Sequence, residues 1–160
     1  MKRTQRLPLP ARRGTLYDRN DKQLAASVYT GNIGFDPTQA LPEPNNQRVT
    51  ERKQRALQDS IVRVADILKR PVAEIETLVQ QSVLEEQNRE AQPNFDPKKR
   101  VRFVLIQKSV PIEIAEQFAD PHHPLFGFGV EDSSKRLYAA GDNAMQIVGY
   151  VDSKGHPETE

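Results

Sequence analysis

Three histidines are the residues of this chain best suited to acid–base or metal chemistry. His122 and His123 are adjacent and stand between Pro121 and Pro124, and His156 lies near the C-terminal end. Imidazole is a common zinc ligand, but a zinc site needs three or four ligands in a defined geometry. Two neighbouring histidines in a proline-flanked loop need further ligands from elsewhere. We therefore interpret all three as exposed loop or tail residues, and we predict no metal site.

Other catalytic patterns are missing from the sequence. It has no cysteine, which excludes a thiol nucleophile and a Cys-ligated metal. It has no Ser-x-x-Lys, Gly-x-Ser-x-Gly, His-Glu-x-x-His or Gly-rich phosphate loop. Glu85 and Glu86 are interpreted as a solvated helix end, and the charged run DPKKR at residues 96–100 as a solvated loop. The residues alone predict a binding or scaffolding domain without a cofactor. A small enzyme built around His122 or His123 and two carboxylates is the alternative.

The composition is balanced in charge and poor in hydrophobic residues. Among 160 residues, 23 are Lys or Arg and 22 are Asp or Glu, so the net charge is +1. The 6% of aromatic residues are not interleaved with a basic stripe, so we predict no nucleic-acid partner. No apolar run approaches the roughly 18 residues that span a bilayer, and no signal-peptide apolar region follows the first residues. We expect a soluble chain, or one separated from an anchor that precedes residue 1.

Short strands are expected towards both ends of the chain. Residues 14–17 and 23–29 predict a hairpin around the turn residues 18–21, and a further short strand at 32–35 ends at Asp36-Pro37. Residues 101–106 predict a strand, and Pro111 opens a short helix. Two more short strands are expected at 126–131 and 135–138, around a turn at 132–134, with a last helix at 143–148.

The middle of the chain predicts a helical pair. Apolar residues recur at three- and four-residue spacing in the first helix, with Thr50 as its cap and Lys69-Arg70 at its end. Pro71 suits the first position of a second helix. Residues 85–100 are polar and are expected to be mobile. The fold class predicted is therefore α+β, in which strands from both chain ends form a base and a helical head lobe is inserted between them.

The opening segment RRGTLYDRNDKQLAAS, residues 12–27, resembles the start of the extracytoplasmic region of class B penicillin-binding proteins, the monofunctional peptidoglycan transpeptidases. In that family, Arg-Gly precedes an Asp-Arg-Asn-Gly turn and a Leu-Ala pair. The matching residues here are Arg13, Gly14, Asp18, Arg19, Asn20, Leu24 and Ala25. Asp21 stands where the family has Gly, which implies a strained or different turn.

The distant segment FGFGVEDSSKRLYAAGDNAMQIVGYV, residues 126–151, resembles a second motif of the same family. The matching residues are Gly129, Val130, Glu131, Arg136, Tyr138, Gly141, Ala144, Gly149, Tyr150 and Val151. Ala139 replaces the usual Pro, and Gln146 stands where His is common. The resemblance covers essentially all of residues 7–151, with both motifs in the family's order.

The resemblance implies a domain organisation. Residues 1–12 would be a juxtamembrane linker and residues 13–151 the non-catalytic pedestal, also called the dimerisation domain, with a helical insert at about 50–88. Residues 152–160 would connect it to a transpeptidase domain that holds the family's Ser-x-x-Lys, Ser-x-Asn and Lys-Thr-Gly motifs. The protein would lie on the extracytoplasmic (periplasmic) face of the membrane, held by an N-terminal helix before residue 1. Its role in elongation, division or sporulation stays open.

The resemblance also implies partners and structural residues. The partners would be the chain's own transpeptidase domain, a membrane-embedded glycan polymerase and morphogenetic or divisome scaffold proteins; a homodimer is left open. The residues that would join the two end segments are Arg13, Gly14, Asp18, Arg19, Asn20, Glu131, Arg136, Tyr138, Gly141 and Gly149. Arg13 or Arg19 is expected to pair with Glu131 or Asp18, and Arg136 to bind a carboxylate likewise. Two alternatives remain: ordinary surface charge, and a stand-alone interaction module without a transpeptidase.

Overall fold

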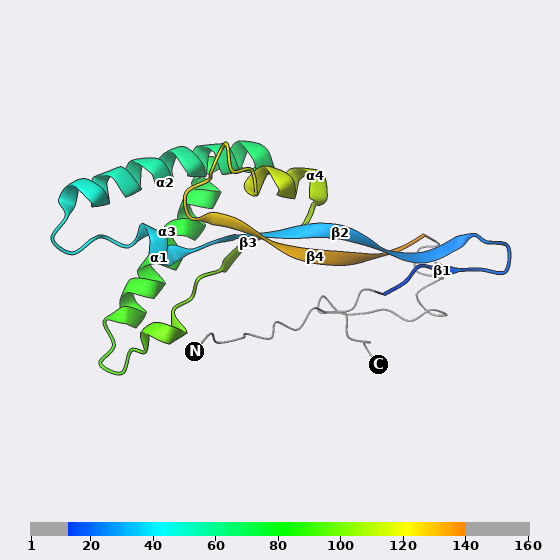
Figure 1. Cartoon of the computed structure of the whole chain (residues 1–160), viewed down its shortest axis with the longest axis horizontal. Coiled ribbons are helices and arrows are strands. Elements are labelled where there is room, and N and C mark those ends of the chain that lie inside the picture. The colour runs from blue at the N-terminus through cyan, green and yellow to red at the C-terminus, as the bar shows by residue number, and fades with distance from the viewer. Residues whose placement is uncertain (1–12, 140–160) are drawn as a thin grey trace, which may run out of the picture. The chain divides into compact units, whose positions relative to one another are not determined.

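A computed structural model of the chain describes residues 13–139, which form an α+β fold (Figure 1). The predicted fold class is therefore confirmed. The chain divides into two compact units. One combines the two chain ends, of which residues 13–29 and 134–139 are described, and the other is formed by Thr30–Ser133. Two long strands, β2 (Gln23–Phe35) and β4 (Phe128–Tyr138), contribute residues to both units.

The strands form one antiparallel arrangement around β2. In the first unit, β1 (Leu16–Tyr17) pairs with the start of β2 through Leu16 opposite Ala25. In the second unit, β3 (Val104–Pro111) pairs with the end of β2 from Thr30 to Phe35. The strand β4 also pairs with β2. A 13-residue central strand thus links the segment near the N-terminal end to the core of the second unit.

Two of the expected strand breaks do not occur. The predicted strands at 23–29 and 32–35 form the single strand β2, and the predicted turn at 132–134 lies inside β4. Turn-prone residues stay extended here because β2 and β4 are paired strands, and strand pairing outweighs local turn preference. Only glycine fits at position 31 of β2, because a Cβ there would lie 2.5 Å from the Cβ of Ala115 and 2.7 Å from Cγ2 of Val130.

The third strand and the short helices differ in their bounds from the predictions. The strand expected at 101–106 lies later, at Val104–Pro111, because its register is set by pairing with β2. Pro111 is the residue before α4 (Ile112–Ala115), which continues into the 3₁₀-helix η2 (Glu116–Phe118), as the proline predicted. The helix expected at 143–148 lies outside the described residues.

Two long helices in the second unit confirm the predicted helical pair. The first, α2 (Gln47–Leu68), begins four residues before the earliest expected start, because Asn46 rather than Thr50 is the cap: its side chain accepts a hydrogen bond from the Val49 amide at 3.2 Å. The helix ends at Lys69, which has a left-handed backbone with φ of 53°. Pro71 then precedes α3 (Val72–Glu90).

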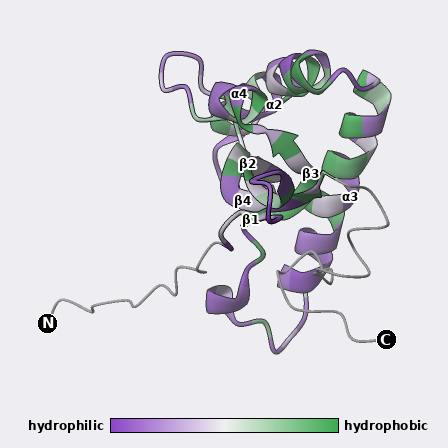
Figure 2. Cartoon of the chain, turned by 90° about the vertical axis from the view of Figure 1, so that its right-hand side faces the viewer, coloured by the Kyte–Doolittle hydropathy of each residue, from purple (hydrophilic) through white to green (hydrophobic). Residues whose placement is uncertain are grey.

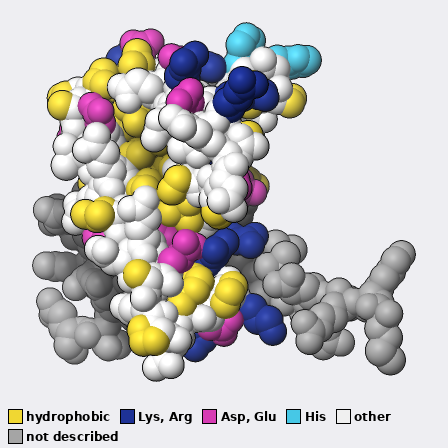
Figure 3. Space-filling view, turned by 90° about the vertical axis from the view of Figure 1, so that its left-hand side faces the viewer, with side chains coloured by type: hydrophobic (Ala, Val, Ile, Leu, Met, Phe, Trp, Pro, Cys, Tyr) yellow, Lys and Arg dark blue, Asp and Glu magenta, His cyan; other side chains and the backbone are white. Residues whose placement is uncertain are grey.

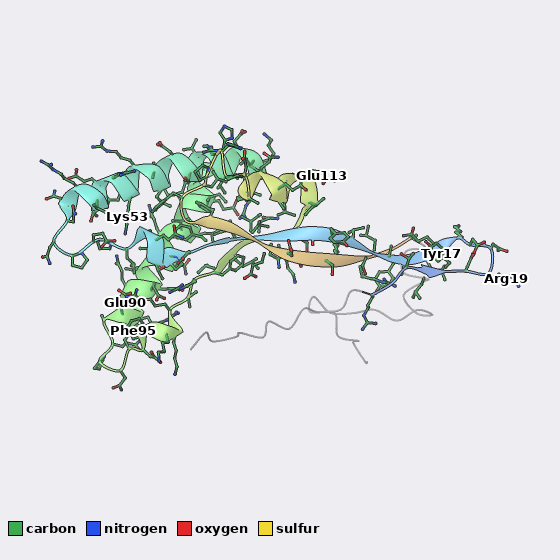
Figure 4. All side chains as sticks on the ribbon, in the orientation of Figure 1. Tyr17, Arg19, Lys53, Glu90, Phe95 and Glu113 are labelled. Atoms are coloured by element: carbon green, nitrogen blue, oxygen red, sulfur yellow. The ribbon has the colours of Figure 1, made fainter. Side chains whose placement is uncertain are left out.

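The second helix is longer than expected, and the segment after it forms contacts with the helix end. The helix continues to Glu90 because Glu86 is buried and accepts a hydrogen bond from Arg89 at 2.9 Å. After the helix, Arg100 forms an ion pair with Glu90 at 2.5 Å and lies 5.7 Å from the centre of the Phe95 ring. Figure 4 labels Glu90 and Phe95 at this end of α3. The 3₁₀-helix η1 (Pro97–Lys99) lies within this segment.

The hydrophobic core of the second unit joins the end of β2 to both long helices. Its fully buried members include Ile33 and Phe35 from β2, Val64 from α2 and Ile75 from α3. A short helix, α1 (Pro37–Ala40), packs beside them. It is capped by Asp36, whose side chain accepts a hydrogen bond from the Thr38 amide at 3.0 Å. Figure 2 shows hydrophobic and hydrophilic stretches alternating along the helices, as amphipathic packing requires.

Candidate functional site

The first unit holds the described residues of the first motif and, from the second motif, Arg136 and Tyr138. Asp18 organises the turn after β1. Its side-chain Oδ1 accepts hydrogen bonds from the amides of Asn20, at 2.7 Å, and Lys22, at 2.9 Å. Its own amide donates to the Lys22 carbonyl at 2.8 Å. The carboxylate of Asp18 therefore shapes the turn, which is the role that an Asx turn gives this residue type.

Asp21 occupies the strained position of the same turn. Its φ is 59°, in the left-handed region that favours glycine. The departure from the family's glycine at this position predicted a strained or different turn, and the backbone angle confirms the strain. The turn residues Arg19 and Asn20 are exposed, and Figure 4 labels Arg19 at the tip of the hairpin.

Arg136 joins the two end segments of the chain. From β4, its Nη1 donates to the carbonyl oxygen of Gly14 at 2.6 Å and to the carbonyl oxygen of Arg13 at 3.5 Å. The same nitrogen lies 3.2 Å from Oγ of Ser27 on β2. Near them, the Ala139 amide donates to the Leu24 carbonyl at 3.0 Å. Residues from three segments of the sequence thus meet at one guanidinium group.

The expected ion pairs are partly replaced by other contacts. Within the described residues, Arg136 binds two carbonyl oxygens and a hydroxyl, so the prediction of a carboxylate partner for it is wrong. The physical reason is that the segment before β1 brings main-chain carbonyls into reach of the guanidinium. Glu131 is exposed on β4 in the other unit, and its pairing with Arg13 or Arg19 stays a prediction. Tyr138 is half-buried at the end of β4, and Gly141 and Gly149 lie outside the described residues.

The sequence did not indicate the long-range contacts of Ser27 and Arg70. Ser27 is an ordinary polar residue of a strand, and only the fold brings it to Arg136. Arg70 binds Glu74 through Nε and Nη2, and its Nη1 donates to the Ile106 carbonyl at 2.9 Å. The hydrogen bonds and charge of Arg70 hold the pKa of Glu74 below its usual range. The basic residue at the end of α2 thereby ties the helical pair to the strand β3.

The histidine pair forms a surface loop. His123 Nδ1 lies 2.9 Å from Asp120 Oδ2, and the His122 amide donates to Oδ1 of the same carboxylate at 2.8 Å. The hydrogen bond to His123, and then that from the His122 amide, lower the pKa of Asp120. Both imidazoles are exposed, as Figure 3 shows. Among residues 13–139 no group of three or more His, Cys, Asp or Glu could hold a metal ion. His156 lies outside the described residues.

The other charged residues considered in the sequence form ordinary structural contacts or are exposed to solvent. Glu85 is exposed and accepts a hydrogen bond from Gln81, whereas Glu86 is buried against Arg89. Lys98 and Lys99 are exposed, as expected for a solvated loop. Across the described part of the chain, no helix combines the length and apolar character required to cross a bilayer.

The chain has an α+β fold in which segments from both chain ends belong to one small unit. The model of the penicillin-binding protein dimerisation domain family matches residues 8–160. The chain therefore belongs to this family, as the two sequence motifs predicted. A comparison with curated proteins gave no match.

Two solved structures are similar to this chain. A peptidoglycan synthetase from Bifidobacterium adolescentis matches with a TM-score of 0.50 and 19% identity over 92% of this chain and 26% of that chain. A penicillin-binding protein, PBP2, solved in complex with MreC from Helicobacter pylori, matches with a TM-score of 0.45 and 19% identity over 89% of this chain and 22% of that chain. The chain spans about a quarter of the length of these two proteins.

Proposed function

We propose that this chain is the non-catalytic pedestal of a membrane-anchored peptidoglycan transpeptidase on the extracytoplasmic (periplasmic) face of the membrane. The pedestal positions the catalytic domain, carries contacts to other proteins of cell-wall synthesis, and binds no penicillin itself. The observation that carries this proposal is membership of the dimerisation-domain family over residues 8–160. The short span of the chain relative to the solved proteins that it matches also supports it.

The hydrogen bonds of Arg136 suggest how such a pedestal works. A segment near the N-terminal end, which would follow a membrane anchor, and the strand β4, which would lead towards a catalytic domain, are held together by one guanidinium group. This contact uses main-chain oxygens, so it fixes the course of the backbone and not merely a pair of side chains. A rigid junction of this kind keeps a following domain at a set place relative to the anchor.

Exposed apolar side chains of the first unit are consistent with a covering domain. Leu16, Tyr17 and Leu137 are 43%, 59% and 45% exposed. Large exposed apolar side chains can mark surfaces that another protein covers. We assign these three side chains to contact with the transpeptidase domain. The helical pair of the second unit is then left for partner proteins, namely a glycan polymerase and morphogenetic or divisome scaffold proteins.

The experiment that tests the proposal uses cells that produce the protein. An antibody raised against this chain is used to blot the membrane fraction, and the recognised band is tested for labelling by fluorescent penicillin. We expect a membrane-bound band several times larger than the 18.1 kDa of this chain, carrying the label. A soluble, unlabelled band near 18.1 kDa would overturn the proposal.

The second candidate function is a stand-alone extracytoplasmic interaction module without a transpeptidase. The unlabelled 18.1 kDa band would support it. The exposed apolar residues Leu16, Tyr17 and Leu137 would then be expected to contact a separate protein. Substitution of Tyr17 by Ser distinguishes the two candidates further. It should impair penicillin labelling of a large enzyme in the first case, and binding of a separate partner in the second.

A further inference from the structure

Three arginines on the first half of α2 form a continuous basic face. Arg48, Arg52 and Arg55 are spaced at i, i+4 and i+7, and all three are exposed. At about 100° per residue, they lie within roughly 60° of one another around the helix. Leu57 and Val64, which face the core, lie on the opposite side. Figure 4 shows nitrogen-tipped side chains projecting from this outer side of α2, and labels Lys53 on the other side.

Among the described residues, these three arginines have no side-chain partner; the same is true of Lys98 and Lys99, whereas most other basic residues of the helical region have one. Five basic side chains of this region form ion pairs with carboxylates: Lys53 with Glu43, Lys69 with Asp66, Arg70 with Glu74, Arg89 with Glu86 and Arg100 with Glu90. Within the described residues, no ion pair or hydrogen bond involves the side chains of Arg48, Arg52 or Arg55. Glu51, the nearest acidic residue in sequence, accepts a hydrogen bond from Gln47 instead.

The positions of Arg48 and Arg52 oppose the stability of the helix. Arg48 lies in the first turn of α2, where the helix dipole favours negative charge, and this first turn has no acidic residue. Arg48 and Arg52 are also like charges at i and i+4, a spacing that destabilises a helix. Arg55, in contrast, has Glu51 four residues before it and Asp59 four residues after it, a spacing of opposite charges that favours a helix. A negatively charged partner would relieve both unfavourable effects.

We propose that the face formed by Arg48, Arg52 and Arg55 docks an acidic α-helix of a partner protein. At about 1.5 Å of rise per residue, the arginines lie roughly 6 Å and 10 Å along the helix from Arg48. Glutamates at i, i+4 and i+7 of a second helix repeat the same spacings on one face, so each guanidinium meets a carboxylate. Arginine binds carboxylates through two parallel N–H donors, which fixes register as well as charge. The proposal rests on the assignment of the helical pair to partner proteins made above, and peptide binding tests it separately from penicillin labelling.

Asp59 gives the docking a direction. It lies one turn beyond Arg55 on the same side of α2, is exposed, and has no ion pair among the described residues. The outer side of the helix thus runs from three positive charges to a negative one. A partner helix with three glutamates followed by a lysine matches this order, and the reverse order places like charges opposite each other.

The test measures binding of two synthetic helical peptides to the full 160-residue chain by fluorescence anisotropy. The first alanine-rich peptide carries glutamates at i, i+4 and i+7, and the second has the same composition with its glutamates spread around the helix. We expect the first peptide to bind more tightly, with an affinity that falls as salt is added. Replacing the three arginines together, as Arg48→Gln, Arg52→Gln and Arg55→Gln, should weaken binding of the first peptide about tenfold.

A matched control removes the same charge elsewhere. The variant with Lys98→Gln, Lys99→Gln and Arg102→Gln also loses three exposed positive charges from the same unit, and it should keep the affinity of the original chain. Circular dichroism establishes that both variants keep their helices. Equal loss of binding in the control, equal binding of the two peptides, or binding of neither would overturn the proposal. Preference of the face for vesicles of anionic phospholipid over the first peptide would overturn it in favour of a lipid surface.

Discussion

Arg136 donates a hydrogen bond to the carbonyl oxygen of Gly14, a residue 122 positions earlier in the chain, over a distance of 2.6 Å. The donor belongs to the second sequence motif and the acceptor to the first. Because the acceptor is a main-chain oxygen, the contact does not depend on the side chain at position 14. The two motifs are therefore joined through backbone geometry, and Arg136 is the side chain on which that junction depends.

Replacing Arg136 should loosen the segment before β1. The change Arg136→Ala removes hydrogen bonds to the Gly14 carbonyl and the Ser27 hydroxyl, and we expect a loss of about 1–2 kcal/mol in the stability of the first unit. Arg136→Lys should recover only part of it, because one ammonium cannot reproduce the fork of donors. Hydrogen exchange of the backbone amides of residues 14–17 measures the effect. The neighbouring change Lys135→Ala is the control, and equal exchange in all variants would contradict the role of Arg136.

Adding one methyl group at Gly34 should destabilise the second unit. A Cβ on this residue would lie 2.3 Å from Cε2 of Phe103, so the ring must shift. We expect Gly34→Ala to cost about 1–3 kcal/mol, measured by urea unfolding. Gly129→Ala is the control, because nothing lies within 4 Å of its Cβ. The additional change Phe103→Leu should restore part of the loss, and no restoration would show that the clash is not the cause.

Restoring glycine at position 21 should stabilise the hairpin. Asp21 has a φ of 59°, where an L-residue is strained and glycine is not. We expect Asp21→Gly to raise stability by about 0.5 kcal/mol, since glycine also makes the unfolded chain more flexible and offsets part of the gain. Asp21→Val should lower it. Thermal unfolding of the three chains measures both effects, and a lower Tm for the glycine variant would exclude strain at this position.

The Arg70–Glu74 ion pair should make stability depend on pH. Arg70 lowers the pKa of Glu74 in the folded chain, so the pair stabilises the fold above the ordinary pKa of the carboxyl group. This contribution is lost as the pH falls through the lowered pKa, because the protonated carboxyl no longer attracts Arg70. Urea unfolding should therefore separate the wild type from Glu74→Gln at neutral pH, and the difference should shrink at about pH 3.

The control for this pH dependence uses a double-mutant cycle. In a chain that already carries Arg70→Gln, the further change Glu74→Gln should alter the free energy of unfolding by a similar amount at neutral pH and at about pH 3. A pH-dependent difference of the same size in that background would assign the effect to another neighbour of Glu74.

Much of the local structure follows from local chemistry. The apolar spacing of Leu57, Ile61 and Val64 predicts one face of α2, because a helix returns to the same side every three to four residues. Pro71 and Pro111 each lie just before a helix, as their restricted backbone predicts. The two sequence motifs predicted the family correctly. The first of them contains the turn residues 18–21, whose conformation depends on residue types that are adjacent in sequence.

Other features depend on contacts between distant segments. The turn-prone residues 132–134 lie within β4, because pairing with β2 outweighs their local preference. Glu86 lies on the same face of α3 as the buried Ile75 and Val79, but its charge argues against burial. The fold nevertheless encloses the side chain, which is bound to Arg89, and α3 continues past it to Glu90.

The amino-acid sequence by itself determined the family, the α+β class and the helical pair, because each of these depends on residue types at short and regular spacing. Tertiary structure alone decided which oxygens Arg136 binds, since the expectation of a carboxylate came from charge, whereas the carbonyl of Gly14 is brought near only by the path of the backbone. Residue types tell which groups can form a bond. The fold decides which of them meet, because its strands place groups 122 residues apart within hydrogen-bond distance.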